Sequence, residues 1–204
     1  PKEVWKAQMA RAAANYQRAG SGQQAAKIVS ALPEFPSFKK MLDLGGGAGL
    51  IGIAIVAEHP SMKGIIFDQP EIVQISKSFI KEYALEDRVE VIGGDYMKDP
   101  IGEGYDLIWA SATLNFARDD MDLIVRKVYD ALNPGGVFIS LHPGLTEERT
   151  QPEGMILGWM SQAMTGKDMG LDQGFIADSM LRVGFKSVRG HTLDIDHGPL
   201  DMDI

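Results

Sequence analysis

The sequence predicts an α/β fold, a doubly wound and mostly parallel sheet of seven strands preceded by two helices. Short apolar segments alternate with helical segments five times after residue 37, and a glycine-rich loop joins the first such strand to its helix. Two further strand-like segments close the chain. A length of 204 residues with 45% hydrophobic residues suits one substantial core. We therefore expect N-terminal helices in residues 1–36 and one domain in residues 37–204.

Composition excludes several classes of partner. The net charge of −8 disfavours nucleic acid, and the absence of cysteine removes disulfide and thiolate chemistry, which fits the cytoplasm. The longest run of apolar residues and glycine, 49–57, is far shorter than the roughly 20 residues of a membrane span, and no signal peptide opens the chain. We expect a soluble cytoplasmic protein with no membrane contact and no metal site. Because residue 1 is Pro rather than Met, we expect a fragment of a longer chain.

The first two elements are helices. Residues 4–19 are rich in Ala, Gln, Arg and Met, which favour helix, and the segment ends at Gly20. Ser21 then has the character of an N-cap for a second helix over 23–32.

The glycine loop is the feature around which the chain is organised. An apolar strand over 38–42 reaches Asp43, passes through a loop and enters an apolar helix over 51–57. Glycine accepts positive φ and lets a ligand approach the backbone, where amides at the helix start can bind it. This pattern predicts a nucleotide cradle. Its glycines are Gly45, Gly46, Gly47 and Gly49.

Two ligand classes compete for this loop. Residues 47–52 satisfy the dinucleotide pattern G-x-G-x-x-G, whereas residues 43–49 read D-x-G-x-G-x-G. The leading carboxylate of Asp43 would attract a positively charged cofactor and repel a pyrophosphate.

Carboxylates also follow the next two strands. The strand over 63–68 ends in Asp68, 21 residues after Gly47, where an acid can accept both ribose hydroxyls; capping the next helix, about 70–83, is a compatible role. The third strand, 89–93, is followed by Asp95 and Tyr96. These could bind an adenine amino group and pack on its ring, or Asp95 could be a loop carboxylate with no ligand.

The rest of the chain completes the alternation. The predicted elements are a strand over 105–110, a helix over 118–132, a stop at 133–136 and a strand over 137–141, then a helix over 172–183, a strand over 185–192 and an edge or hairpin strand over 200–204. Between them, residues 142–174 contain Met155, Met160, Met164 and Met169 around Trp159. Such methionines suit an adaptable pocket, but we favour a helix packed on the sheet.

Four segments together resemble the class I S-adenosylmethionine-dependent methyltransferases. They are residues 43–49, 67–73, 94–96 and 134–136. The phrase Leu-Asp-Leu-Gly-Gly-Gly-Ala-Gly with Asp-Gln-Pro-Glu-Ile-Val is similar to the small-molecule O-methyltransferase family that includes the caffeate and acetylserotonin enzymes, over about residues 5–204.

The resemblance implies S-adenosylmethionine as cofactor, a small-molecule acceptor methylated on oxygen, and a Rossmann-like methyltransferase fold in residues 37–204. Asp43 and the loop glycines would hold the methionine portion, Asp68 the ribose, and Asp95 with Tyr96 the adenine, and Gln69 would be a further cofactor-binding residue. Ser111 matches the position of a cofactor-contacting lysine. Members usually carry an N-terminal dimerisation domain, so residues 1–36 would be the remnant of a connection to it, and a homodimer would form through a domain absent from this chain.

The catalytic position departs from the family pattern. A family histidine takes the proton from the attacking hydroxyl, and Asn115 stands at that position. An amide cannot act as a general base. Either the acceptor arrives as an anion, another residue is the base, or activity has been lost. His142, which follows the fifth strand, is a candidate substitute, whereas His59, His191 and His197 have no second feature around them.

Three functions therefore remain open at this point. The leading hypothesis is an active methyltransferase, followed by a domain that binds the cofactor without turnover, and then a nicotinamide dehydrogenase. Asp43 and Asp95 have no role in a dehydrogenase, and no hydride-transfer residue set is visible.

Overall fold

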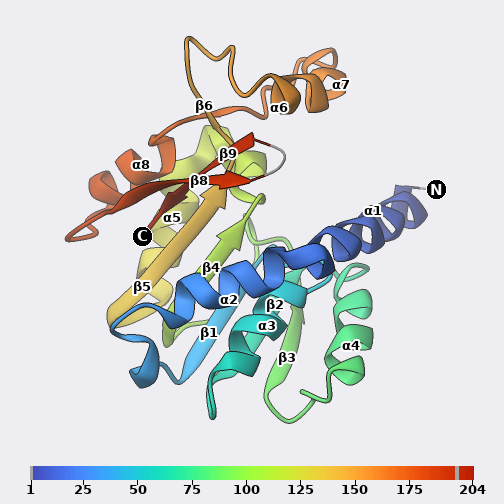
Figure 1. The fold of residues 1–204 in the computed structure, drawn as a ribbon, viewed down its shortest axis with the longest axis vertical. Helices are drawn as coiled ribbons and strands as arrows, with labels where there is room; N and C mark the ends of the chain where they lie inside the picture. The colour runs from blue at the N-terminus through green and yellow to red at the C-terminus, as the bar shows by residue number, and fades with distance from the viewer. Residues whose placement is uncertain (1, 196–197) are drawn as a thin grey trace. The chain divides into compact units, whose positions relative to one another are not determined.

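A computed structural model describes residues 2–195 and 198–204. The sheet contains β1 (Lys40–Leu44), β2 (Lys63–Asp68), β3 (Val89–Gly93), β4 (Tyr105–Ser111), β5 (Leu132–His142), β8 (Gly190–Ile195) and β9 (Gly198–Asp203). Their order is β3-β2-β1-β4-β5-β9-β8 (Figure 1). Strand pairs β1–β2, β1–β4 and β2–β3 are parallel, while β5–β9 and β8–β9 are antiparallel. The predicted α/β class and mostly parallel seven-stranded sheet are confirmed.

The chain divides into two compact units. The first comprises Pro1–Trp109 with Ala131–Val137, and the second comprises Ala110–Asp130 with Phe138–Ile204. Among the described residues, no helix combines the length and the apolar character needed to cross a bilayer.

The first unit opens with a nearly continuous helical segment. The helices of the first unit are α1 (Lys2–Tyr16), the π-helical η1 (Gln17–Ser21), α2 (Gly22–Ser30), the 3-10 turn η2 (Phe35–Ser37), α3 (Leu50–Glu58) and α4 (Val73–Glu82), of which α1, η1 and α2 follow one another directly. The predicted N-cap at Ser21 is wrong. Ser21 has helical φ and ψ and makes no capping bond, because η1 carries the helix onward with a kink at Gly20, φ 136°. The Ser21 hydroxyl instead donates to the Tyr16 carbonyl, 3.3 Å away.

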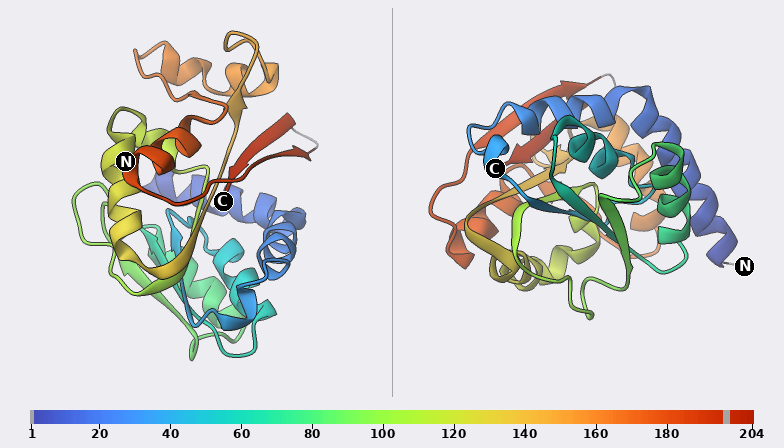
Figure 2. Two further views of the ribbon diagram at one scale, coloured as in Figure 1. Left: turned by 90° about the vertical axis from the view of Figure 1, so that its left-hand side faces the viewer. Right: turned by 90° about the horizontal axis from the view of Figure 1, so that it is seen from below.

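Helix α3 lies in the core of the first unit. It contacts α2 as well as strands β1 and β2 (Figure 1), and α1 approaches α4 in the views of Figures 1 and 2. Because α3 is covered from more than one direction, it is apolar around its circumference, with Ile53, Ile55 and Val56 all buried. Each such side chain contributes roughly 1.5–3 kcal/mol by leaving water. This burial anchors the helix whose first turn closes the glycine loop.

The second unit contains η3 (Leu114–Asp120), α5 (Met121–Ala131), β6 (Gly144–Leu145), α6 (Glu153–Gly158), α7 (Met160–Ala163), β7 (Leu171–Asp172) and α8 (Phe175–Val183). The short strands β6 and β7 form a separate parallel ladder, which the sequence did not predict. Asp122 on α5 accepts hydrogen bonds from Ser179 and Arg182 on α8, at 2.6 to 3.0 Å.

Several predicted elements of the second unit need correction. The helix expected over 118–132 begins at Met121 because residues 114–120 form a 3-10 segment, and the one expected from 172 begins at Phe175, after Gly174 with φ 78°. The strand expected over 185–192 begins only at Gly190.

The packed-helix interpretation of the methionine-rich stretch is wrong for most of its length. Helices α6 and α7 contain no buried residue, and Met164 is 83% exposed, whereas Met169 is buried.

Candidate functional site

The glycine loop lies between β1 and α3, at the point where the strand order reverses between β1 and β4. In open α/β sheets this switch point is where ligands bind. Gly45, Gly47 and Gly49 have φ of 67°, 61° and 82°. The amides of Gly45 and Gly46 both donate to the Phe67 carbonyl on β2, at 2.8 and 3.2 Å. The loop is therefore wound tightly onto the end of β2 in a conformation that glycine adopts at least cost.

Asp43 lies beneath the loop. It is 2% exposed, and its Oδ2 accepts a hydrogen bond from the Gly52 amide at 3.0 Å. A Cβ on Gly46 or Gly52 would approach this oxygen to 2.6 or 2.8 Å, so both glycines are needed to accommodate the carboxyl group. Burial, with a smaller contribution from the charge of Asp68, raises the pKa of Asp43 to about 7, opposed by the Gly52 hydrogen bond. The third glycine of the dinucleotide pattern thus has a packing role.

Asp68 connects the tip of β2 to the loop. Its Oδ2 accepts from the Gly47 amide at 2.8 Å, and its Oδ1 accepts from the Gln69 amide at 2.7 Å. Ser76 on α4 donates to the Gly47 carbonyl at 2.8 Å. Both backbone groups of Gly47 are therefore held, and the half-buried Asp68 carboxylate lies at the loop, as the 21-residue spacing indicates.

Asp95 and Tyr96 follow β3 and reach the same edge of the sheet. The Gly94 amide donates to the Asp68 carbonyl at 2.9 Å, which brings this turn beside β2. The Asp95 carboxylate caps its own turn by accepting from the Met97 amide at 3.0 Å, and it pairs with Lys98 at 2.7 Å. Asp43, the glycine loop, Asp68, Gln69, Asp95 and Tyr96 thus gather in the first unit.

Ser111, Asn115 and His142 belong to the second unit. Ser111 ends β4, and the next residue, Ala112, has φ 51° with its amide donating to Leu141 at 2.8 Å. Asn115 lies in η3, is 8% exposed, and its Oδ1 is a buried atom with no hydrogen-bond partner among the described residues. An acceptor oxygen in this state is available to a hydroxyl donor.

His142 ends β5 and is also buried without hydrogen bonds at either ring nitrogen, within the described residues. Its Nε2 lies 3.9 Å from Oδ2 of Asp201, the residue opposite it in the β5–β9 pair. Burial lowers the pKa of His142 to about 4, although the charge of Asp201 opposes this. His142 is consequently neutral near pH 7 and holds a free lone pair, but it is a weak base.

Two more polar residues share this face of the β5–β9 pair. Ser140 and Asp203 lie opposite each other, two residues from His142 and Asp201, and Ser140 Oγ and Asp203 Oδ2 are likewise unpartnered in the described part of the chain. Burial, and then the charge of Asp201, raises the pKa of Asp203 to about 7. Asp201 and Asp203 were not among the site residues predicted from the sequence. The alternation over 200–204 was the available signal, since it places both carboxylates on one face.

The other histidines have different surroundings. His59 accepts from the amides of Ser61 and Met62 at its Nδ1 and ends α3, a structural role. His191 is exposed on β8, and His197 lies outside the described residues. Over residues 2–195 and 198–204, no three His, Cys, Asp or Glu side chains converge as a metal site would require.

Comparison with known proteins identifies relatives. A family model described as an O-methyltransferase domain matches residues 6–167. An uncharacterised protein of Methanocaldococcus jannaschii is 39% identical over 58% of this chain and 31% of its own length. Human acetylserotonin O-methyltransferase is 30% identical over 56% of this chain and 33% of its own. The chain spans about a third of the length of the curated relatives it matches.

Solved structures share the fold. An O-methyltransferase family 2 protein from Planctomyces limnophilus, in complex with apigenin, matches with a TM-score of 0.79 at 22% identity, covering 100% of this chain and 61% of that protein. Human N-acetylserotonin methyltransferase, in complex with S-adenosylmethionine, matches with a TM-score of 0.76 at 22% identity, covering 98% and 56%.

Proposed function

Since this chain belongs to the O-methyltransferase domain family, we propose that it takes part in methyl transfer from S-adenosylmethionine to an oxygen of a small-molecule acceptor. One observation carries the proposal: the glycine loop is closed onto Asp68 through the Gly47 amide, at the switch point of the sheet. The structure of human N-acetylserotonin methyltransferase was solved in complex with the same cofactor.

The residues of the first unit suit this cofactor. The loop backbone and Asp43 would hold the methionine portion, Asp68 with Gln69 the ribose hydroxyls, and Asp95 with Tyr96 the adenine. Each carboxylate oxygen has two lone pairs, so Asp68 can accept from a ribose hydroxyl while keeping its bonds to Gly47 and Gln69. Ser111 is proposed as a further contact. When bound, S-adenosylmethionine supplies an electrophilic methyl group.

We assign Asn115 and His142 to the acceptor. The unpartnered Oδ1 of Asn115 can accept a hydrogen bond from a second, un-ionised donor group of the acceptor and so orient the reacting oxygen. His142 is the candidate base, but its pKa of about 4 is roughly 6 units below that of a phenol near 10, an unfavourable difference of about 8 kcal/mol for a full proton transfer. The proposed acceptor is therefore an acidic hydroxyl compound that is largely ionised near neutral pH.

The test measures S-adenosylhomocysteine release with a panel of acidic phenols and matched neutral phenols. The proposal expects turnover with acidic acceptors, and micromolar binding of S-adenosylhomocysteine by calorimetry. Binding of NADH without binding of S-adenosylhomocysteine would overturn the cofactor assignment. Tight cofactor binding with no turnover on any acceptor would instead indicate a catalytically silent domain.

The remaining expectations stay predictions. They are a cytoplasmic location, the absence of nucleic acid as a partner, dimerisation through another segment, and the division between residues 1–36 and 37–204.

A further inference from the structure

Residues 146–170, here called the methionine segment, leave and rejoin the second unit at a single point. They start directly after β6 and end directly before β7, and these strands pair with each other, Gly144 with Leu171 and Leu145 with Asp172. Between the two strands, α6 and α7 bury no residue, and Leu157, Met160 and, directly after α7, Met164 are exposed. Packing therefore does not fix α6 and α7, and the position of the segment depends on contacts near its ends, where Pro152, Met169 and Gly170 are buried.

The segment begins with a strained turn. Glu147, Glu148 and Arg149 have φ of 49°, 56° and 68°, three consecutive non-glycine residues in the left-handed region. This conformation is unfavourable for L-residues and persists only where the surroundings enforce it. A bridge between Thr146 and Gln151 closes the turn, and Thr150 Oγ1 donates to the Glu147 carbonyl at 2.6 Å. The effect of the turn is to fix the direction of Arg149.

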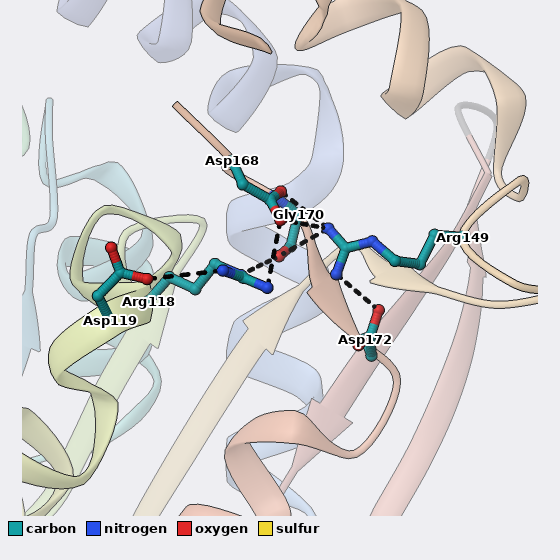
Figure 3. Close-up of polar contacts among 6 residues, drawn as sticks. All are labelled: Arg118, Asp119, Arg149, Asp168, Gly170 and Asp172. Atoms are coloured by element: carbon teal, nitrogen blue, oxygen red, sulfur yellow. Dashed lines mark hydrogen bonds and ion pairs between the residues drawn. The ribbon is translucent and has the colours of Figure 1, made fainter. Parts of the chain in front are cut away.

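Arg149 joins the two ends of the segment (Figure 3). Its Nη2 lies 2.8 Å from both carboxylate oxygens of Asp168, and its Nη1 lies 3.0 Å from Asp172 Oδ1. Gly170 permits this arrangement, because a Cβ there would approach Arg149 Nη2 to 2.7 Å and Leu145 Cδ1 to 2.5 Å.

A second arginine ties the same carboxylate to η3. Arg118, three residues after Asn115, places Nη2 3.2 Å from Asp168 Oδ2, and its Nε donates to the Gly170 carbonyl at 3.0 Å. Asp168 thus lies between two guanidinium groups that come from different elements, as Figure 3 shows.

The net charge and the exposure of these arginine and aspartate side chains limit what the cluster can bind. Arg118 and Arg149 face three carboxylates, Asp119, Asp168 and Asp172, so the net charge is −1 and a further anion would be repelled. The side chains of Arg118, Arg149 and Asp168 are 29%, 35% and 49% exposed, so water and salt can compete for their contacts. The cluster is suited to holding a segment reversibly and unsuited to binding an anionic ligand.

We propose that Arg118, Arg149 and Asp168 form a latch that holds the methionine segment at the turn carrying Asn115. With the latch closed, both ends of the segment and η3 are fixed together through Asp168. With it open, the segment moves about the β6–β7 ladder. The idea that this motion admits the acceptor rests on the function proposed above. The latch itself does not depend on that function.

Hydrogen exchange followed by mass spectrometry tests the latch without requiring turnover. In Asp168→Asn, peptides within residues 150–167 should exchange about threefold to tenfold faster than in the wild type, while peptides within 40–58 stay unchanged. Asp119→Asn is the matched control, since Asp119 is 92% exposed and contacts Arg118 only at 3.5 Å. Its exchange should equal that of the wild type. In wild type, 1 M NaCl should reproduce part of the Asp168→Asn effect.

A second measurement uses only the wild type, so it tests the latch even if Asp168→Asn does not fold. Trypsin should cut wild type after the exposed Lys167 faster at 1 M NaCl than at 50 mM, relative to an unstructured reference peptide. Equal exchange over 150–167 in Asp168→Asn and wild type would overturn the latch, and so would salt-independent cleavage. Because both readings are independent of cofactor, failure of methyl transfer would leave them interpretable.

Discussion

The candidate cofactor residues and the candidate acceptor residues differ in how their polar atoms are satisfied. In the first unit, Asp43 and Asp68 bond the backbone of the loop and of the helix that follows it. In the second unit, Asn115 Oδ1, Ser140 Oγ, both ring nitrogens of His142 and Asp203 Oδ2 are buried without partners, as judged on the described residues. A buried unpaired polar atom costs roughly 1–3 kcal/mol. The loop is thus held in place by its own hydrogen bonds, whereas the buried polar atoms of the second unit are the ones that a hydrogen-bonding ligand would satisfy.

The largest expected effect tests the rigidity of the glycine loop. Gly49→Ala should destabilise the protein by about 2–5 kcal/mol, because it combines a positive φ of 82° with a Cβ that would lie 2.4 Å from Ile66 Cδ1. Gly47→Ala is the control, with φ 61° and open space around its Cβ, and should cost only about 1–2 kcal/mol. Urea denaturation measures both. Equal losses would show that the loop has room to adjust.

Removal of the carboxylate that closes the loop should mainly affect ligand affinity. Asp68→Ala should weaken S-adenosylhomocysteine binding by about tenfold to 150-fold, corresponding to about 1.5–3 kcal/mol, because it would remove the proposed ribose acceptor as well as the bond to Gly47. Calorimetry measures the dissociation constant. An unaltered value would exclude Asp68 from the site.

The pH dependence of the free energy of unfolding compares the buried titratable groups of the two units. Burial raises the pKa of Asp43 to about 7, so the folded state binds its proton more tightly than the unfolded state, where the pKa is 3.8. Stability therefore rises as pH falls from 8 to 6, by about 1 kcal/mol from Asp43. Asp203 acts in the same direction, while His142, whose pKa is lowered, acts in the opposite direction.

Asp43→Asn should remove the Asp43 part of this dependence and raise stability at pH 8, since the amide oxygen can still accept from Gly52. Urea denaturation of wild type and variant at pH 6 and pH 8 gives the comparison. A pH response that is the same in both proteins would mean that Asp43 does not titrate in this range.

The smallest expected effect on cofactor affinity concerns Asn115. Asn115→His should leave the dissociation constant for S-adenosylhomocysteine within about threefold, roughly 0.6 kcal/mol, because the neutral amide contributes no charge to cofactor binding. For a neutral phenol the same variant should raise the single-turnover rate, up to about 10²-fold, and for an acidic acceptor it should not. A tenfold loss of cofactor affinity would place Asn115 among the cofactor residues instead.

The elements that the sequence predicted correctly are those whose conformation depends on residues close together in the chain. The boundaries of β2 and β3 match those expected, 63–68 and 89–93, because each is a short apolar run between turn residues. The glycine loop was recognisable because its conformation is imposed by its own residue types.

What the sequence did not predict depends on distant partners. The left-handed turn at residues 147–149 contains no glycine, and its conformation is understandable only with Asp168 and Asp172 in place. Asp201 and Asp203 became candidates only through their register with His142 and Ser140. The 3-10 segment after Thr113 likewise replaces a helical start that residue propensities favoured.

The β6–β7 ladder has a consequence for how this fold can vary. Because Leu145 and Asp172 are paired neighbours, whatever lies between them begins and ends at one place. Lengthening such a connection costs only about 0.6 kcal/mol for each doubling, so residues 146–170 can be exchanged without moving β5 or α8. The β6–β7 ladder therefore allows residues 146–170 to vary in length and sequence, and with them the surface that they form, while the seven-stranded sheet keeps its register.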